Sequence, residues 1–243
     1  MEQGRMDNAA RIAGLLYLVV VVTGIFNLMY LPSQIQVSGE AIATASHIVA
    51  SGLLFRLGIV ADLVCYTAFL LLPLALYRLL SPAGGNAAAL MVAFAVVQVP
   101  IAFVNTVHKL DILSLLGGAS YLHAFTADQL NSQVMLALDA YRHGLLVLEI
   151  FSGLWLLPLG YLMFKCGFLP RVLGIALMLG CLGYQIDFVG SVIFPGYPKT
   201  FIADVVTLPA SFGEIGTCLW LLIMGARSGF QRVHSGDVAH LSS

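Results

Sequence analysis

Charged residues are scarce in this 243-residue sequence: they make up 9% of it, against about a quarter of an ordinary soluble domain. Eleven Lys and Arg nearly balance twelve Asp and Glu, which gives a formal net charge of −1. Nucleic-acid binding requires a basic excess, so DNA and RNA are not expected as partners. The chain is 60% hydrophobic with a mean hydropathy of +0.95, which predicts a lipid bilayer as its main solvent.

Cysteine is also scarce and widely spaced. The four cysteines, Cys65, Cys166, Cys181 and Cys218, form no C-x-x-C pair and fall within or beside apolar runs. A quinone-linked disulfide-exchange enzyme needs a close reactive pair, so this class is disfavoured. The four side chains are expected to pack between helices as small buried groups.

Long apolar runs dominate what the sequence does contain. A membrane-spanning helix needs about 20 mostly apolar residues, and six stretches meet this requirement. They cover approximately residues 11–31, 53–80, 86–117, 140–165, 171–194 and 204–226. The sequence therefore predicts an all-α, six-span transmembrane helical bundle, in which residues 1–243 form a single integral membrane domain.

Basic residues are distributed unevenly between the two sides of this predicted bundle. On the side of the termini lie Arg5, Arg11, Arg78, Lys165, Arg171, Arg227 and Arg232. The other side and its half of the membrane hold Arg56, Lys109, Arg142 and Lys199. Because basic segments stay in the cytoplasm, both termini are predicted to be cytoplasmic, with residues 227–243 as a cytoplasmic tail.

Two connections on the outer side are long enough to carry short interfacial helices. Residues 38–51 have an apolar face, with Ser38 as the N-cap, and residues 126–139 have a second apolar face. Both segments are expected to lie on the membrane surface and cover the bundle.

An internal repeat relates some of the spans. Residues 149–160 and 214–225 share Glu-Ile, Leu-Trp-Leu-Leu and Gly at matching positions. Arg11 and Arg171 each begin a span with a glycine three residues later. Three helical hairpins of common origin explain this pattern, and chance matching between apolar helices is the alternative.

Ionisable and polar side chains also occur within the apolar spans. A charge in hydrocarbon costs several kcal/mol, so it usually faces a protein interior or a wet cavity. Asp62, Glu149, Asp187 and Glu214 lie well inside their spans, whereas Arg56, His108, Lys109, Asp111 and His143 lie nearer the outer interface. Helical spacing predicts polar stripes at Thr23, Asn27 and Tyr30, at Gln98, Asn105 and His108, and at Gly180, Tyr184, Asp187 and Ser191.

These polar residues have two interpretations. They can neutralise one another as buried pairs that fix the geometry of the bundle. However, the embedded acids outnumber the embedded bases, and an unpaired buried carboxylate becomes a proton carrier or a cation site. The predicted ligand- or ion-binding residues are Arg56, Asp62, Asn105, His108, His143, Glu149, Tyr184, Asp187 and Glu214.

Specific cofactor chemistry finds little support. The metal-ligand spacings H-x-x-x-H and E-x-x-H do not occur inside a span, which disfavours zinc and di-iron. His108 and His143 lie too near the outer surface to favour haem. No metal is predicted, and the identity of any cofactor stays open.

Several segments resemble a known bacterial membrane family. They are Arg11–Leu18, Leu54–Leu63, Gly167–Gly174 with Gly183–Asp187, and Gly213–Glu214 with Trp220–Leu222. As a set they are similar to domain-of-unknown-function family four-three-eight-six, over about residues 8–226. The resemblance implies a multi-pass fold and no agreed activity. The sequence as a whole predicts a protein of the inner membrane. Family members often carry a histidine where this sequence has Trp155, so no role of that histidine transfers here.

The favoured hypothesis is the binding or translocation of a small solute at a carboxylate-lined polar pocket, coupled to protonation. The pocket is expected in the outer half of the membrane. One alternative is an accessory or structural subunit of a larger membrane complex, with a membrane-protein partner. The other alternative is a membrane-embedded enzyme.

Overall fold

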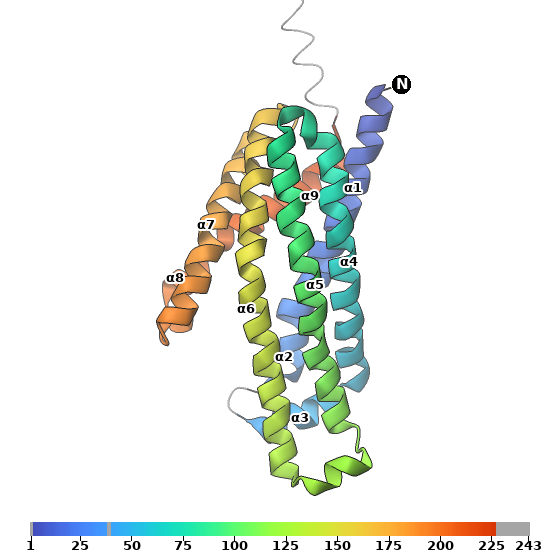
Figure 1. The fold of residues 1–243 in the computed structure, drawn as a ribbon, viewed down its shortest axis with the longest axis vertical. Coiled ribbons are helices and arrows are strands. Elements are labelled where there is room, and N and C mark those ends of the chain that lie inside the picture. The colour runs from blue at the N-terminus through green and yellow to red at the C-terminus, as the bar shows by residue number, and fades with distance from the viewer. Residues whose placement is uncertain (1, 38–39, 227–243) are drawn as a thin grey trace, which may run out of the picture. The chain divides into compact units, whose positions relative to one another are not determined.

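The computed structural model of the chain describes residues 2–37 and 40–226. These residues form helices and contain no strand (Figure 1). Six helical stretches are long and apolar enough to cross a membrane: Met6–Ile35, Gly52–Ala83, Gly85–Leu116, Ala127–Cys166, Arg171–Ile193 and Phe201–Ile223. The predicted all-α fold with six spans is therefore confirmed.

Glycines end two of the long helices. Helix α5 (Gly85–Leu116) is followed by Gly118 with φ 69°, and α6 (Ala127–Cys166) is followed by Gly167 with φ 78°. These angles lie in the left-handed region, which costs glycine little and strains other residues. A glycine in this conformation is a common way to stop a helix.

One of the two expected short helices is present. Helix α3 (Ala41–Ala50) is separate from the spans, with Glu40 at its N-cap position, whereas the predicted cap Ser38 lies outside the described residues. The second prediction, for residues 126–139, is wrong, because this segment is continuous with α6. Reciprocal backbone-to-side-chain hydrogen bonds between Thr126 and Gln129 cap its start, and no proline or glycine interrupts the helix before Gly144.

The first span contains a wide helical turn. Helix α1 (Glu2–Ile25) leads into a π-helical turn, Phe26–Tyr30, and then into α2 (Leu31–Ile35). The Leu31 N–H bonds to the Phe26 carbonyl, five residues back. The next residue is Pro32, which has no N–H to donate, so the ordinary ladder is already interrupted there.

The wide turn changes which polar side chains share a face. Asn27 is buried, but Tyr30 is half exposed, and Thr23 donates to the Val19 carbonyl within its own helix. The predicted stripe of Thr23, Asn27 and Tyr30 is therefore wrong, because the prediction assumed an unbroken period of 3.6 residues.

Residue contacts divide the chain into two compact units, which are described separately. The Asp62 unit comprises Val19–Thr67 and Val99–Leu148. The Trp155 unit comprises the described parts of Met1–Leu18, Ala68–Gln98 and Glu149–Ser243. Single helices, such as α4 (Gly52–Leu80), contribute residues to both units.

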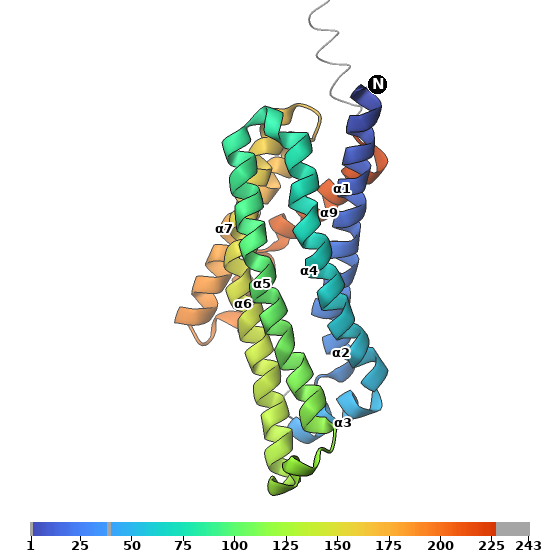
Figure 2. The same ribbon diagram turned by 45° about the vertical axis from the view of Figure 1, so that its right-hand side comes forward.

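The core of the Asp62 unit is aliphatic with one aromatic ring. In this unit α5 and α6 run side by side and are joined through a 3₁₀ turn, Ser120–Ala124 (Figures 1 and 2). Helices α2 and α3 contact each other. The buried core residues are Leu31, Ile35, Ile48, Phe55, Ile59, Ile112, Val134 and Leu138.

The Trp155 unit is built around one buried indole. The Trp155 ring meets Phe69 edge-on at 5.0 Å between centroids and Tyr17 at 6.1 Å, arrangements that aromatic pairs prefer. Helix α7 (Arg171–Ile193) packs against α9 (Leu208–Ile223). The short α8 (Phe201–Val205) precedes α9.

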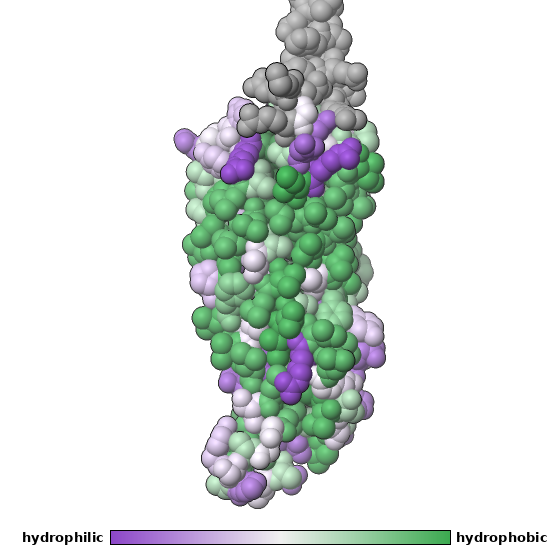
Figure 3. Space-filling model, turned by 90° about the vertical axis from the view of Figure 1, so that its right-hand side faces the viewer, coloured by the Kyte–Doolittle hydropathy of each residue, from purple (hydrophilic) through white to green (hydrophobic). Residues whose placement is uncertain are grey.

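Many large apolar side chains face outward on the long helices. Apolar residues cover most of the face drawn in Figure 3. Examples of half-exposed or more exposed side chains are Leu15, Val104, Val172 and Ile223. Water-soluble monomers rarely expose so much apolar surface, whereas lipid acyl chains solvate it well, as expected of a multi-pass membrane protein.

Candidate functional site

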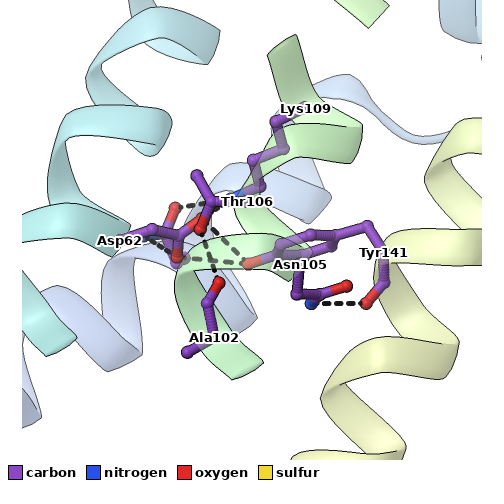
Figure 4. Close-up of polar contacts among 7 residues, drawn as sticks. Asp62, Ala102, Asn105, Thr106, Lys109 and Tyr141 are labelled. Carbon is purple, nitrogen blue, oxygen red and sulfur yellow. Dashed lines mark hydrogen bonds and ion pairs between the residues drawn. The ribbon is translucent and has the colours of Figure 1, made fainter. Parts of the chain in front are cut away.

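A buried ion pair lies at the centre of the Asp62 unit. Lys109 on α5 places its ammonium nitrogen 2.7 Å from the Oδ2 atom of Asp62 on α4 (Figure 4). The two side chains are only 3% and 5% exposed. Asp62 thus finds its ionic partner on another helix.

Two further donors complete the coordination of the Asp62 carboxylate. The Asn27 amide donates to Oδ1 at 2.8 Å, and the Tyr141 hydroxyl lies 3.1 Å from both carboxylate oxygens. Lys109 also donates to the Asn27 Oδ1 atom at 3.2 Å. A carboxylate has about four acceptor sites, so the three donors occupy most of its capacity.

Local sequence features bring these side chains together. The π-helical turn contains Asn27, and a methyl group on Gly58 would collide with Leu31 and crowd the Asn27 side chain. A methyl group on Gly144 would collide with Asn105, whose amide donates to the Tyr141 carbonyl at 3.0 Å. Glycine at these two positions therefore permits the close approach that the cluster requires.

Lys109 has an aromatic neighbour as well as an acidic one. Its ammonium nitrogen lies 4.3 Å from the centroid of the Tyr141 ring. A cation above an aromatic face is attracted by the negative face of the ring, and the attraction is stronger where water is excluded. Tyr141 therefore holds the lysine through its ring and the aspartate through its hydroxyl.

A cavity of about 230 Å³ adjoins this cluster and lies entirely within the Asp62 unit. Its polar lining consists of Asn27, Gln36, Lys109, Tyr141 and Arg142. Its apolar lining consists of Leu28, Leu31, Pro32, Ile35, Phe55, Leu138 and Leu145. Because Leu28 and Arg142 are at least half exposed, the cavity reaches the surface of the unit.

The predicted candidates of this unit fall into two groups. Asn105 is buried beside Tyr141, in the same cluster as Asp62. The other three are at least partly exposed: His108 lies 3.7 Å from Asp111, and His143 and Arg56 are exposed. On α5, the buried polar stripe continues from Asn105 to Lys109, one helical turn on, instead of to His108 as predicted.

The remaining candidates belong to the Trp155 unit. Tyr17, itself buried, donates to Glu214 at 3.2 Å, and Tyr184 lies within electrostatic range of the same Tyr17 hydroxyl. Glu149 and Asp187 are half-buried neighbours whose carboxyl groups interact directly. The unit thus holds the other three of the four embedded acids.

Helix α7 presents its polar stripe as predicted. Gly180 is buried and Tyr184, Asp187 and Ser191 are half-buried. Outside the spans, burial raises the pKa of the Tyr197 hydroxyl, and the neighbouring Asp187 carboxyl raises it further.

Two residues of the central cluster, Lys109 and Tyr141, were not among the site residues predicted from the sequence. Lys109 had been placed near the outer interface, and Tyr141 had been given no role. Lys109 follows Asn105 by four residues, which puts both on one helix face, so the helical spacing could have identified the lysine. Nothing comparable in the sequence marks Tyr141.

The described residues contain no group of three or more His, Cys, Asp or Glu side chains that could hold a metal ion. The donor set around Asp62 consists of an ammonium, an amide and a phenol. This arrangement satisfies a carboxylate and leaves little lone-pair density for a cation.

Comparison with known proteins gives a family and no activity. A family model described as a domain of unknown function, DUF4386, matches residues 12–225. The chain is 30% identical over 154 residues to an uncharacterized protein of Archaeoglobus fulgidus. This match covers 63% of the chain and 74% of the archaeal protein. No solved structure matches the chain.

Proposed function

The chain belongs to the DUF4386 family, and we propose that it binds or translocates a small solute in the cavity of the Asp62 unit. One observation carries the proposal: the buried Lys109, held 2.7 Å from Asp62, also lines a cavity of about 230 Å³. A charged side chain that is enclosed on one side and borders an accessible space on the other is positioned to meet a ligand.

The energetics of buried ion pairs support this interpretation over a purely structural one. Desolvating two charges costs several kcal/mol per ion, and a well-packed apolar pair of similar volume is often as stable. Ionisable residues within membrane spans therefore usually mark substrate or ion pathways. The Asp62–Lys109 pair fits that description, since its lysine lines the cavity.

The proposed setting is an inner membrane with both chain termini in the cytoplasm. Its support is the excess of basic residues on the side of the termini, seven against four, over six apolar spans.

Cysteine accessibility tests whether solutes reach the cavity. In a background lacking Cys65, Cys166, Cys181 and Cys218, the test variant is Leu31→Cys, at a lining position that is 2% exposed. Labelling is measured in nanodiscs with two small water-soluble methanethiosulfonate reagents, one anionic and one cationic. We expect at least one reagent to modify this cysteine.

The matched control is Ile48→Cys, in the same aliphatic core and 1% exposed, but outside the cavity lining. We expect Leu31→Cys to react at least about tenfold faster with one of the reagents, because only it borders a space that holds several waters. Equal and slow labelling of both variants by both reagents would refute an accessible solute cavity.

A further inference from the structure

The side-chain oxygens of Asp62 and Asn27 beside the cavity already accept hydrogen bonds. Asp62 accepts from Asn27, Lys109 and Tyr141, and these contacts use both of its oxygens. The Asn27 carbonyl oxygen accepts from Lys109. A ligand that enters here meets few free lone pairs on this cluster.

The donors of the same wall are only partly used. The ammonium of Lys109 has three N–H groups, and the contacts described above use two. The Asn27 amide has two N–H groups and uses one on Asp62. The Arg142 guanidinium has five N–H groups, and one of them donates to Asp139 at 3.2 Å. The wall therefore offers hydrogens and favours a ligand that supplies lone pairs.

The charges that line the cavity have one sign. Lys109 and Arg142 belong to the lining, whereas their acidic partners Asp62 and Asp139 do not. An anion can approach the two bases directly, and it meets no carboxylate on the wall.

Size and wall chemistry restrict the rest of the ligand. Seven of the twelve lining residues are apolar, and the volume of about 230 Å³ lies below the ~300–1,000 Å³ typical of drug-sized ligands. The ligand therefore has one polar end and a short apolar body.

We propose that the cavity of the Asp62 unit binds a small organic carboxylate, with its anionic group toward Lys109 and Arg142 and its apolar body among Leu31, Phe55 and Leu138. The proposal rests on the proposed function, because it names the ligand class of the same cavity. A carboxylate suits these donors, since Asn27 and Lys109 already bind one in Asp62.

Protection of Leu31→Cys from labelling tests the ligand class. Hexanoate, hexan-1-ol and hexylammonium are compared in nanodiscs of zwitterionic lipid, because they share one apolar chain and differ in charge. We expect hexanoate to slow labelling about tenfold or more at saturation, and the other two to slow it less than about twofold. Acetate, which lacks the apolar body, is expected to need a much higher concentration.

Arg142→Gln tests the cationic wall without removing a buried group, since Arg142 is half exposed. We expect it to raise the half-protecting hexanoate concentration about fivefold, because a partly exposed charge contact contributes roughly 1 kcal/mol. Arg56→Gln is the control, because Arg56 is an exposed base of the same unit outside the lining. It should leave protection unchanged.

The outcomes separate the two proposals. If Leu31→Cys labels no faster than Ile48→Cys, the solute cavity itself is refuted. If Leu31→Cys labels rapidly but hexylammonium or hexan-1-ol protects as well as hexanoate, the cavity stands and the carboxylate assignment is wrong. Equal effects of Arg142→Gln and Arg56→Gln would also overturn the assignment. So would protection by phosphatidic acid in the nanodisc without protection by hexanoate, since the occupant would then be a lipid.

Discussion

The two single removals of the Asp62–Lys109 pair should together destabilise the protein more than removing both partners at once. Lys109→Met leaves a carboxylate that is 5% exposed with only the neutral donors Asn27 and Tyr141. Asp62→Leu leaves an ammonium that is 3% exposed with one neutral acceptor, the Asn27 carbonyl. An uncompensated buried charge costs about 3–5 kcal/mol, so each single variant should lose that much unfolding free energy.

The double variant Asp62→Leu/Lys109→Met contains neither charge. Its remaining cost comes from the Asn27 and Tyr141 groups that lose their acceptor, roughly 1–3 kcal/mol each. The sum of the two single losses therefore exceeds the loss of the double variant by about 4 kcal/mol, which is the coupling energy of the pair.

Equilibrium unfolding in mixed micelles measures this coupling. Helical circular dichroism is followed as the mole fraction of sodium dodecyl sulfate rises, for the wild type, both single variants and the double variant. The control cycle is Arg142→Gln with Asp139→Asn, a pair in the same unit whose side chains are 51% and 47% exposed. Its coupling should stay below about 1 kcal/mol. Additive single losses at Asp62 and Lys109, to within about 0.5 kcal/mol, would show that the buried pair does not exist.

Two further predictions concern topology and helix packing. In a cysteine-free background on intact cells, an impermeant reagent should label Lys199→Cys and leave Ser81→Cys unlabelled; labelling of position 81 alone would invert the topology. Gly160→Ala should lower the unfolding free energy by about 1–3 kcal/mol, because its methyl group would strike the Gly174 carbonyl. The control is Gly24→Ala, whose methyl group meets nothing within 4 Å. This variant should raise the unfolding free energy by about 0.5–1 kcal/mol. A similar loss in both glycine variants, measured in the same unfolding assay, would contradict this account of the α6–α7 contact.

The parts of the fold that depend on apolar length could be predicted from the sequence. Six runs of about 20 apolar residues are hard to place anywhere other than in a bilayer. The prediction failed at residues 126–139, where an amphipathic pattern was interpreted as a separate helix. Amphipathicity shows which face of a helix is buried but not where the helix ends, and no breaker separates this segment from the next span.

Prediction of the site residues required finer information than the length of the apolar runs. Asp62 and Asn105 were identified because a polar side chain in an apolar span needs a partner, and this requirement is visible in the sequence. The sequence assigned His108, and not Lys109, to the polar stripe that contains Asn105. This assignment was wrong because the two residues are adjacent, and their positions around the helix differ by a single residue step. The assignment of Tyr30 to a polar stripe was wrong for a related reason. The π-helical turn at Phe26–Tyr30 changes which residues share a helix face, and a period of 3.6 residues does not predict this change. Tyr141 could not be identified, because tyrosines near the ends of spans are common whether or not they bind anything.

The hydrogen-bond balance of the two units bears on the choice between a solute-binding protein and an accessory subunit. Around Asp62, every carboxylate oxygen has a donor, and the spare capacity consists of N–H groups that border a cavity. Among the described residues, the buried polar side-chain atoms without a hydrogen-bond partner are Gln98 Oε1, Glu149 Oε2, Tyr197 OH and Trp220 Nε1, and all belong to the Trp155 unit. All four atoms are enclosed, and Glu149 and Tyr197 lie beside the Asp187 carboxyl, so these atoms offer no surface to a partner protein. The accessory-subunit alternative therefore gains no support from these atoms. The solute proposal depends on the Asp62 unit, so substitutions at Glu149 and at Lys109 should affect different properties of the protein.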